Sequence, residues 1–205
     1  MIKISFWTAI ASILLFFWSL FILWLSIFIA PFENLEMLWI IVPVWLVWFF
    51  SEFFQEKRGT SFGNAISNGV VALWVGIDWI RYLIRLIGEG EIDYGMQTYS
   101  KFFLSFIVFV YGLIIIIYGI KTRSYIKYIG RIREITYVLL MLSPVVYGIV
   151  EMHWKTALAM ILFFPLFYYV IEIIDTRTPN PKTYESDGPK ERSFGESSNQ
   201  NFRKF

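Results

Sequence analysis

The stretch of sequence that decides the fold lies close to the N-terminus and reads SFWTAIASILLFFWSLFILWLSIFIA, residues 5–30. No Asp, Glu, Lys or Arg occurs between residues 6 and 32. A helix needs about 20 apolar residues to cross a hydrocarbon core about 30 Å thick, and this stretch is longer than that. It also exceeds the roughly 7–15 apolar residues of a secretory signal. We therefore predict a retained transmembrane helix.

The composition of the whole chain agrees with a membrane location. Of its 205 residues, 57% are hydrophobic and 17% are charged, whereas a soluble domain has about 45–50% apolar and about 25% charged residues. The sequence contains no Cys and one His, which excludes disulfides, thiolate chemistry and any site that needs two histidines. The net charge of +2 is too small to indicate nucleic-acid binding. We predict a multi-pass protein of the lipid bilayer, with no cofactor and no nucleic-acid partner.

Further apolar stretches follow along the chain and predict an all-α bundle of six transmembrane spans. Lys and Arg concentrate in cytoplasmic loops of membrane proteins. If both termini are cytoplasmic, only Arg81, Arg85, Lys101 and Lys155 fall on the opposite side. A five-span alternative would place the basic loop 121–134 outside, so six spans are favoured. The predicted spans are residues 5–30, 37–54, 60–87, 102–120, 135–150 and 156–174.

Residues 1–175 are expected to form the transmembrane domain. Two segments of the chain are expected to lie outside the hydrocarbon core of the bilayer. Residues 121–134 place Ile126 and Ile129 at helical spacing, with Lys127 and Arg131 on another face. This pattern is typical of a basic interfacial helix or loop at anionic headgroups. Residues 176–205 are rich in Ser, Pro, Asn, Glu and Lys, which predicts a disordered cytoplasmic tail.

The third span carries the polar residues that indicate a function. At about 100° per residue, Asn64, Asn68, Asp78 and Arg81 fall on one face of a helix. Ionisable side chains inside a membrane are costly, and by default they mark a functional site. The functional interpretation is a polar pathway or binding site along this span, with Glu52 and Glu56 near its cytoplasmic mouth.

A structural interpretation of the same residues remains open. Asp78 could pair with Arg81 or Arg85 close to the far interface. Asn64 and Asn68 would then hydrogen-bond across helices, as amide side chains commonly do inside membrane bundles. In that case the polar face stabilises the bundle and conducts nothing.

Four carboxylates are expected near the cytoplasmic ends of two spans. Glu52 and Glu56 share a helix face, and Glu172 and Asp175 repeat the pattern at the end of the sixth span. If the two spans are neighbours, these oxygen ligands would suit Mg²⁺, Mn²⁺ or Ca²⁺. The alternative is an ordinary solvated loop, and metal binding stays undecided at this point.

The sequence lacks the enzymatic signatures that could be tested. No expected span contains a histidine for intramembrane serine hydrolysis, and no Walker loop or dinucleotide loop occurs, so an enzyme is disfavoured, although metal-assisted phosphotransfer by carboxylates stays possible. We expect a small permease or channel subunit, which would need a homo-oligomer because six spans enclose little space. The alternative is a non-catalytic scaffold or accessory subunit whose polar face docks another membrane protein.

Overall fold

The computed structural model describes residues 6–56 and 59–178, and every regular element within them is helical. This confirms the predicted all-α class. The elements are α1 (Phe6–Ile29), η1 (Ala30–Glu33), α2 (Leu35–Phe50), η2 (Ser51–Gln55), α3 (Phe62–Glu89), α4 (Met96–Ile120), α5 (Ile126–Ile129), α6 (Ile132–Val146) and α7 (Trp154–Arg177).

Local sequence signals begin and end several of these helices. The side chain of Asn34 caps α2 by accepting from the backbone N–H groups of Glu36 and Met37. Ser61 caps α3 in the same way. Gly90 ends α3 with φ of 75°, a left-handed conformation that glycine adopts without strain.

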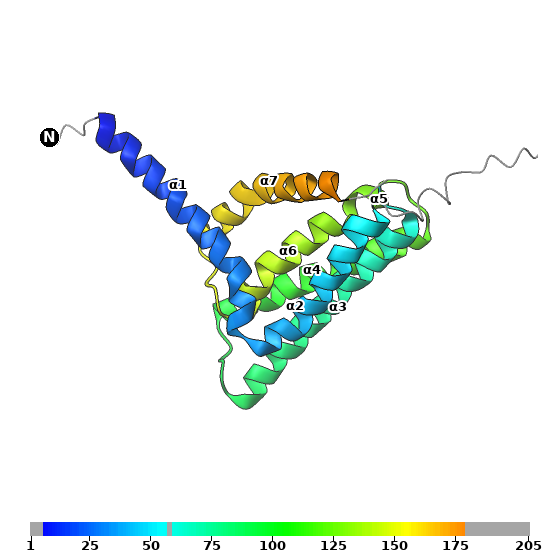
Figure 1. Ribbon diagram of the computed structural model, residues 1–205. Helices are drawn as coiled ribbons and strands as arrows, with labels where there is room; N and C mark the ends of the chain where they lie inside the picture. Colours follow the sequence, from blue (N-terminus) through cyan, green and yellow to red (C-terminus); the bar gives the residue numbers. More distant parts are fainter. Residues whose placement is uncertain (1–5, 57–58, 179–205) are drawn as a thin grey trace, which may run out of the picture.

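Helices α2, α3, α4 and α6 run beside one another, whereas α1 diverges from them, and α3 and α4 form the closest pair (Figure 1). Glycines allow this approach, because a Cβ built on Gly76 would lie 2.7 Å from the backbone nitrogen of Phe109. A Cβ on Gly112 would likewise collide with the backbone of Leu73. Small residues of this kind are the usual means by which membrane helices come close.

Helices α1 and α7 are joined mainly by aromatic side chains. Trp24 and Phe163 lie 5.6 Å apart between ring centroids, and Phe28 stacks on Phe167 at 6.1 Å. Trp24 Nε1 also donates to the hydroxyl of Tyr137 at 3.0 Å, and that hydroxyl donates to the carbonyl of Met160 at 2.5 Å. This chain of contacts ties α1, α6 and α7 together.

Within the described residues, four helical stretches are long and apolar enough to cross a membrane: Trp7–Glu33, Leu35–Gln55, Met96–Ile120 and Trp154–Arg177. They match four of the six expected spans. The other two, α3 and α6, fall short for physical reasons. α3 carries several charges, and the 15 residues of α6 extend only about 22 Å. The count of six spans and the orientation of the termini therefore stay predictions.

Some expected boundaries differ from those of the structure. The basic segment 121–134 contains a single helical turn, α5, and its last residues already belong to α6. Ile126 is fully buried in the bundle, although it was expected to face headgroups. Helix α7 continues to Arg177, past the expected tail boundary at 176. The rest of the expected tail, residues 179–205, lies outside the described residues.

Candidate functional site

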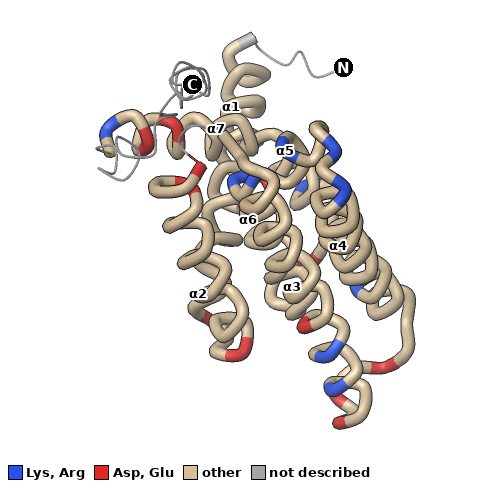
Figure 2. The backbone as a smooth tube through the Cα atoms, turned by 90° about the vertical axis from the view of Figure 1, so that its right-hand side faces the viewer, with Lys and Arg blue, Asp and Glu red and all other residues tan. Residues whose placement is uncertain are grey.

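The polar residues of α3 divide between two ends of the bundle. Asn68 is 1% exposed and Asp78 is 8% exposed, so both side chains face inward. They lie ten residues apart, which corresponds to about 15 Å along a helix. Between them Ala72 and Val75 are each 1% exposed. The face expected to be a polar pathway is therefore interrupted by a buried apolar layer, and Figure 2 shows the charged residues gathered toward the ends of the bundle.

At one end a cavity of about 150 Å³ is enclosed by several elements. We call it the carboxylate pocket. It is formed by η2, the connection to α3, the start of α6 and the end of α7. η2 is a π-helical turn, a feature that is frequent at functional sites. The lining residues are Glu52, Glu56, Gly59, Thr60, Arg131, Arg133, Glu172 and Asp175.

Arg133 connects the acidic residues of two helices across this pocket. Its Nε donates to Glu52 Oε1 at 2.9 Å, and its Nη1 donates to Glu172 Oε2 at 2.9 Å. The guanidinium also lies 4.3 Å from the ring centroid of Tyr168. Arg133 is 4% exposed and Glu52 is 6% exposed. A charge buried to this degree requires such partners, because removing one partner leaves the other uncompensated.

Glu56 is held from three directions. It accepts hydrogen bonds from Thr60 Oγ1 at 2.6 Å and from Asn68 Nδ2 at 2.7 Å. The backbone N–H of Ile132, at the start of α6, lies 3.5 Å from Oε2, the oxygen that also accepts from Thr60. A helix N-terminus favours a negative charge. The amide of Asn68 also donates to the carbonyl of Gly130 at 2.8 Å.

The four carboxylates, which the sequence brings together only if the two spans are neighbours, line this one pocket. Glu52 and Glu172 both bind Arg133. Among residues 6–56 and 59–178, no group of three or more acidic or histidine side chains is placed to hold a metal ion.

Asp78 lies at the opposite end in a cluster of paired groups. Its Oδ1 accepts from Arg81 Nη2 at 2.7 Å and its Oδ2 accepts from the Tyr147 hydroxyl at 2.8 Å. Tyr82 stacks on Tyr147 with 4.1 Å between the ring centroids. We call these four residues the Asp78 cluster. The pairing of Asp78 with Arg81 agrees with the structural interpretation of the sequence.

A second ion pair reinforces this end. Arg85 binds both carboxylate oxygens of Glu36 at the start of α2. Both side chains are partly exposed. The pair joins α2 to α3.

The structure therefore brings together Glu52, Glu56 and Asn68, and it separates them from Asp78 and Arg81. Asn64 lies at the edge of the first group, where its Nδ2 is 3.5 Å from the carbonyl of Gln55.

The sequence analysis missed Arg133 and Thr60. Arg133 lies within a run of basic residues that resembles an interfacial segment. Its partner Glu52 is 81 residues away, and no local pattern indicates that pairing. The spacing of Thr60 from Glu56, one helical turn, is the only signal that could have indicated their contact.

Comparison of the chain with models of protein families, with curated proteins and with solved structures gave no match.

Proposed function

We propose that this protein is a small permease-type membrane protein with six spans and both termini in the cytoplasm. Its solute site is the carboxylate pocket, and its solute is a small organic cation. The observation that carries the proposal is a nearly closed cavity, lined by charged side chains from three helices, at one end of a bundle of apolar helices.

The charge of the pocket supports a cationic solute. Among the described residues, four carboxylates and two guanidinium groups line it, so these carboxylates outnumber these guanidinium groups. Arg133 already neutralises Glu52 and contacts Glu172. Within the part of the chain that the structure describes, the side chains that donate to Glu56 are the neutral ones of Thr60 and Asn68. The ammonium group of a solute would form an ion pair with the Glu56 carboxylate.

The apolar layer of α3 favours a carrier over an open channel. Ala72 and Val75 are buried between the carboxylate pocket and the Asp78 cluster. A carrier needs a closed layer on one side of its solute in each state, whereas a channel needs a continuous polar path. A change of packing around these two residues would open the pocket toward the other side.

The orientation rests on charge distribution. The basic loop 121–134 and the end of α7 lie at the same end of the bundle as the carboxylate pocket (Figure 2). Excess Lys and Arg marks the cytoplasmic side. The pocket would then face the cytoplasm.

Methylammonium is a suitable first probe. We expect the purified full chain to bind it in detergent and to carry radiolabelled methylammonium into proteoliposomes. Glu56→Gln removes the free charge but keeps the side-chain shape, and it should abolish both signals. Glu91→Gln, in an exposed loop, is the matched control and should leave them unchanged. If methylammonium binding and uptake are the same in the two variants, or if Glu56→Gln leaves both signals unchanged, the proposal is refuted.

A scaffold or accessory role is the second candidate, and one observation favours it. Helix α1 leaves the bundle toward its N-terminal end (Figure 1), and Leu14 and Trp18 are 64% and 60% exposed. Such a helix is available to a second membrane protein. Measurement of the particle mass after mild solubilisation distinguishes the roles: a stoichiometric hetero-complex supports the scaffold, and a homo-oligomer supports the permease.

A further inference from the structure

The connection between α4 and α6, residues 121–130, carries three basic side chains that the proposed solute site does not use. Lys121, Arg123 and Lys127 are all exposed, and we call them the basic triplet. No Asp or Glu occurs between residues 94 and 133. Within residues 6–56 and 59–178, no carboxylate pairs with any of the three. Figure 2 shows the basic residues gathered around α5 and the end of α4. Their positive charge attracts an anion.

The basic triplet begins where an apolar helix ends. Helix α4 is long and apolar enough to cross a membrane, and its last residue, Ile120, is 68% exposed. Lys121 follows directly. Tyr125 and Tyr128 of the same connection are 48% and 75% exposed, and tyrosine is enriched where membrane and water meet. These observations place the connection at the depth of the lipid headgroups.

Packing holds the connection against the bundle. Ile126 in α5 is fully buried, and the Tyr111 hydroxyl of α4 donates to the carbonyl of Ile129. The backbone at Gly130 lies so close to α3 that a Cβ built there would be 2.9 Å from the Cβ of Ala65. Because the backbone is already fixed by these contacts, little conformational entropy is lost when the basic side chains bind an anion.

We propose that the α4–α6 connection binds the phosphate groups of anionic phospholipids of the phosphatidylglycerol type. The basic triplet contacts the phosphates, and Tyr125 and Tyr128 lie among the headgroups. Basic side chains beside a transmembrane helix attract anionic lipids. Phosphatidylcholine carries the same phosphate together with a cation, for which the connection offers no carboxylate. This site is separate from the carboxylate pocket and does not depend on the proposed transport.

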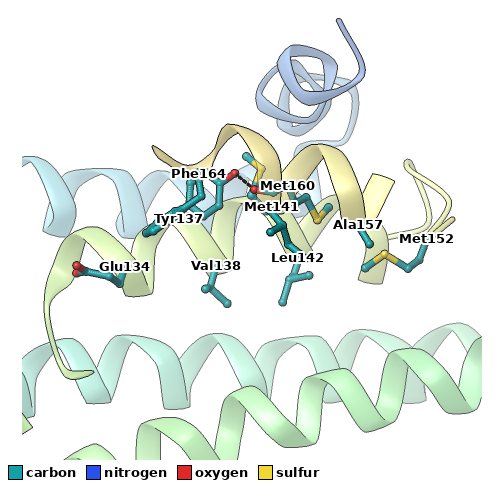
Figure 3. Close-up of a pocket in the computed structure, with 10 residues that line it drawn as sticks. Glu134, Tyr137, Val138, Met141, Leu142, Met152, Ala157, Met160 and Phe164 are labelled. Carbon is teal, nitrogen blue, oxygen red and sulfur yellow. Dashed lines mark hydrogen bonds between the residues drawn. The ribbon is translucent and has the colours of Figure 1, made fainter. Parts of the chain in front are cut away.

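A cavity between α6 and α7 provides a control surface for this proposal. Its volume is about 450 Å³, and Figure 3 shows Val138, Leu142 and Met152 among the mostly apolar side chains that line it. An apolar surface contacts acyl chains and does not distinguish one headgroup from another. Ile161 also lines this cavity and is 74% exposed. Ile161→Ala therefore changes an apolar contact and leaves the basic triplet intact.

Native mass spectrometry of the detergent-purified full chain tests the headgroup. Phosphatidylglycerol and phosphatidylcholine with the same acyl chains are each titrated. We expect phosphatidylglycerol to bind about tenfold tighter. The triple variant Lys121→Gln, Arg123→Gln, Lys127→Gln should reduce this difference to about twofold or less. Because all three side chains are exposed, its thermal unfolding should match that of the unmodified chain.

Single variants test whether the position of the charge decides the preference. Lys127→Gln alone should lower it, whereas Lys155→Gln removes an exposed cation outside the connection and should keep it. Ile161→Ala should keep it as well. No preference in the unmodified chain, or a preference that survives in the triple variant, would overturn the proposal.

Two further outcomes would also overturn it. A preference lost in Ile161→Ala and kept in the triple variant would place the lipid at the α6–α7 cavity. Binding of an acidic protein through the basic triplet, without any lipid preference, would show that the connection docks a protein.

Discussion

The carboxylate pocket and the Asp78 cluster lie at opposite ends of α3 and use their charges differently. In the Asp78 cluster the acid pairs with Arg81, one turn away on its own helix, and with a tyrosine hydroxyl. In the carboxylate pocket Arg133 is bound by acids from two other helices, and a cavity remains beside it. Local pairing holds a helix end together, whereas the pairing of Arg133 with distant residues surrounds a cavity of about 150 Å³. Our proposed function therefore uses the carboxylate pocket, and it treats the Asp78 cluster as a structural contact.

Arg133→Leu is the most severe test of this comparison. It leaves the buried carboxylate of Glu52 without a counter-charge, which should destabilise the protein by about 3–5 kcal/mol. Thermal unfolding in detergent measures the loss. Arg131→Leu, at a more exposed position of the same pocket, is the control and should have a much smaller effect.

The double variant Glu52→Leu, Arg133→Leu sharpens the result. Removing both buried charges should restore most of the stability, because the penalty comes from the unpaired partner. A double variant as unstable as Arg133→Leu alone would show that the pair does not act as a unit.

Tyr147→Phe tests the Asp78 cluster. The change removes the hydroxyl that donates to Asp78 Oδ2, and leaving this buried oxygen without a donor should cost about 1–3 kcal/mol. Methylammonium uptake by the folded fraction should stay within about twofold of the unmodified chain, an effect of under 0.5 kcal/mol. A larger loss of uptake without a loss of stability would show that the Asp78 cluster takes part in transport.

Asp78→Asn should have a smaller effect on stability. The amide oxygen still accepts from Tyr147, and Arg81 is 62% exposed, so losing this ion pair costs about 0–1 kcal/mol. Uptake should again be retained, in contrast to Glu56→Gln. Loss of uptake in Asp78→Asn comparable to that in Glu56→Gln would contradict the division between the two ends.

Arg85→Gln should produce the smallest change. Its pair with Glu36 is partly exposed, and exposed ion pairs often contribute nothing measurable. Unfolding scans at low and high salt should coincide with those of the unmodified chain. A clear loss of stability would mean that this pair holds α2 against α3.

The sequence predicted the helical class and the inward face of α3, because length, apolar composition and helical spacing are local properties. Asn68 and Asp78 are buried as that face requires. The spacing could not reveal the apolar layer between them, since Ala72 and Val75 are indistinguishable in sequence from lipid-facing residues. The basic composition of residues 121–134 likewise predicted that Arg133 lies at the membrane surface, although its side chain is buried. Only the packing of α2, α6 and α7 determines that position.

Accessibility of single cysteines along α3 and its neighbours tests the central claim most directly, and the chain has no cysteine to interfere. Cysteine in place of Thr60 or Glu56 should react with a membrane-impermeant thiol reagent added from the cytoplasmic side. Cysteine at Ala72 or Val75 should be protected from both sides in the absence of solute. Reaction at Ala72 and Val75 comparable to that at Thr60 would reveal a continuous water path. Protection at Thr60 and Glu56 would mean that the carboxylate pocket is closed to solutes, and either result contradicts the account.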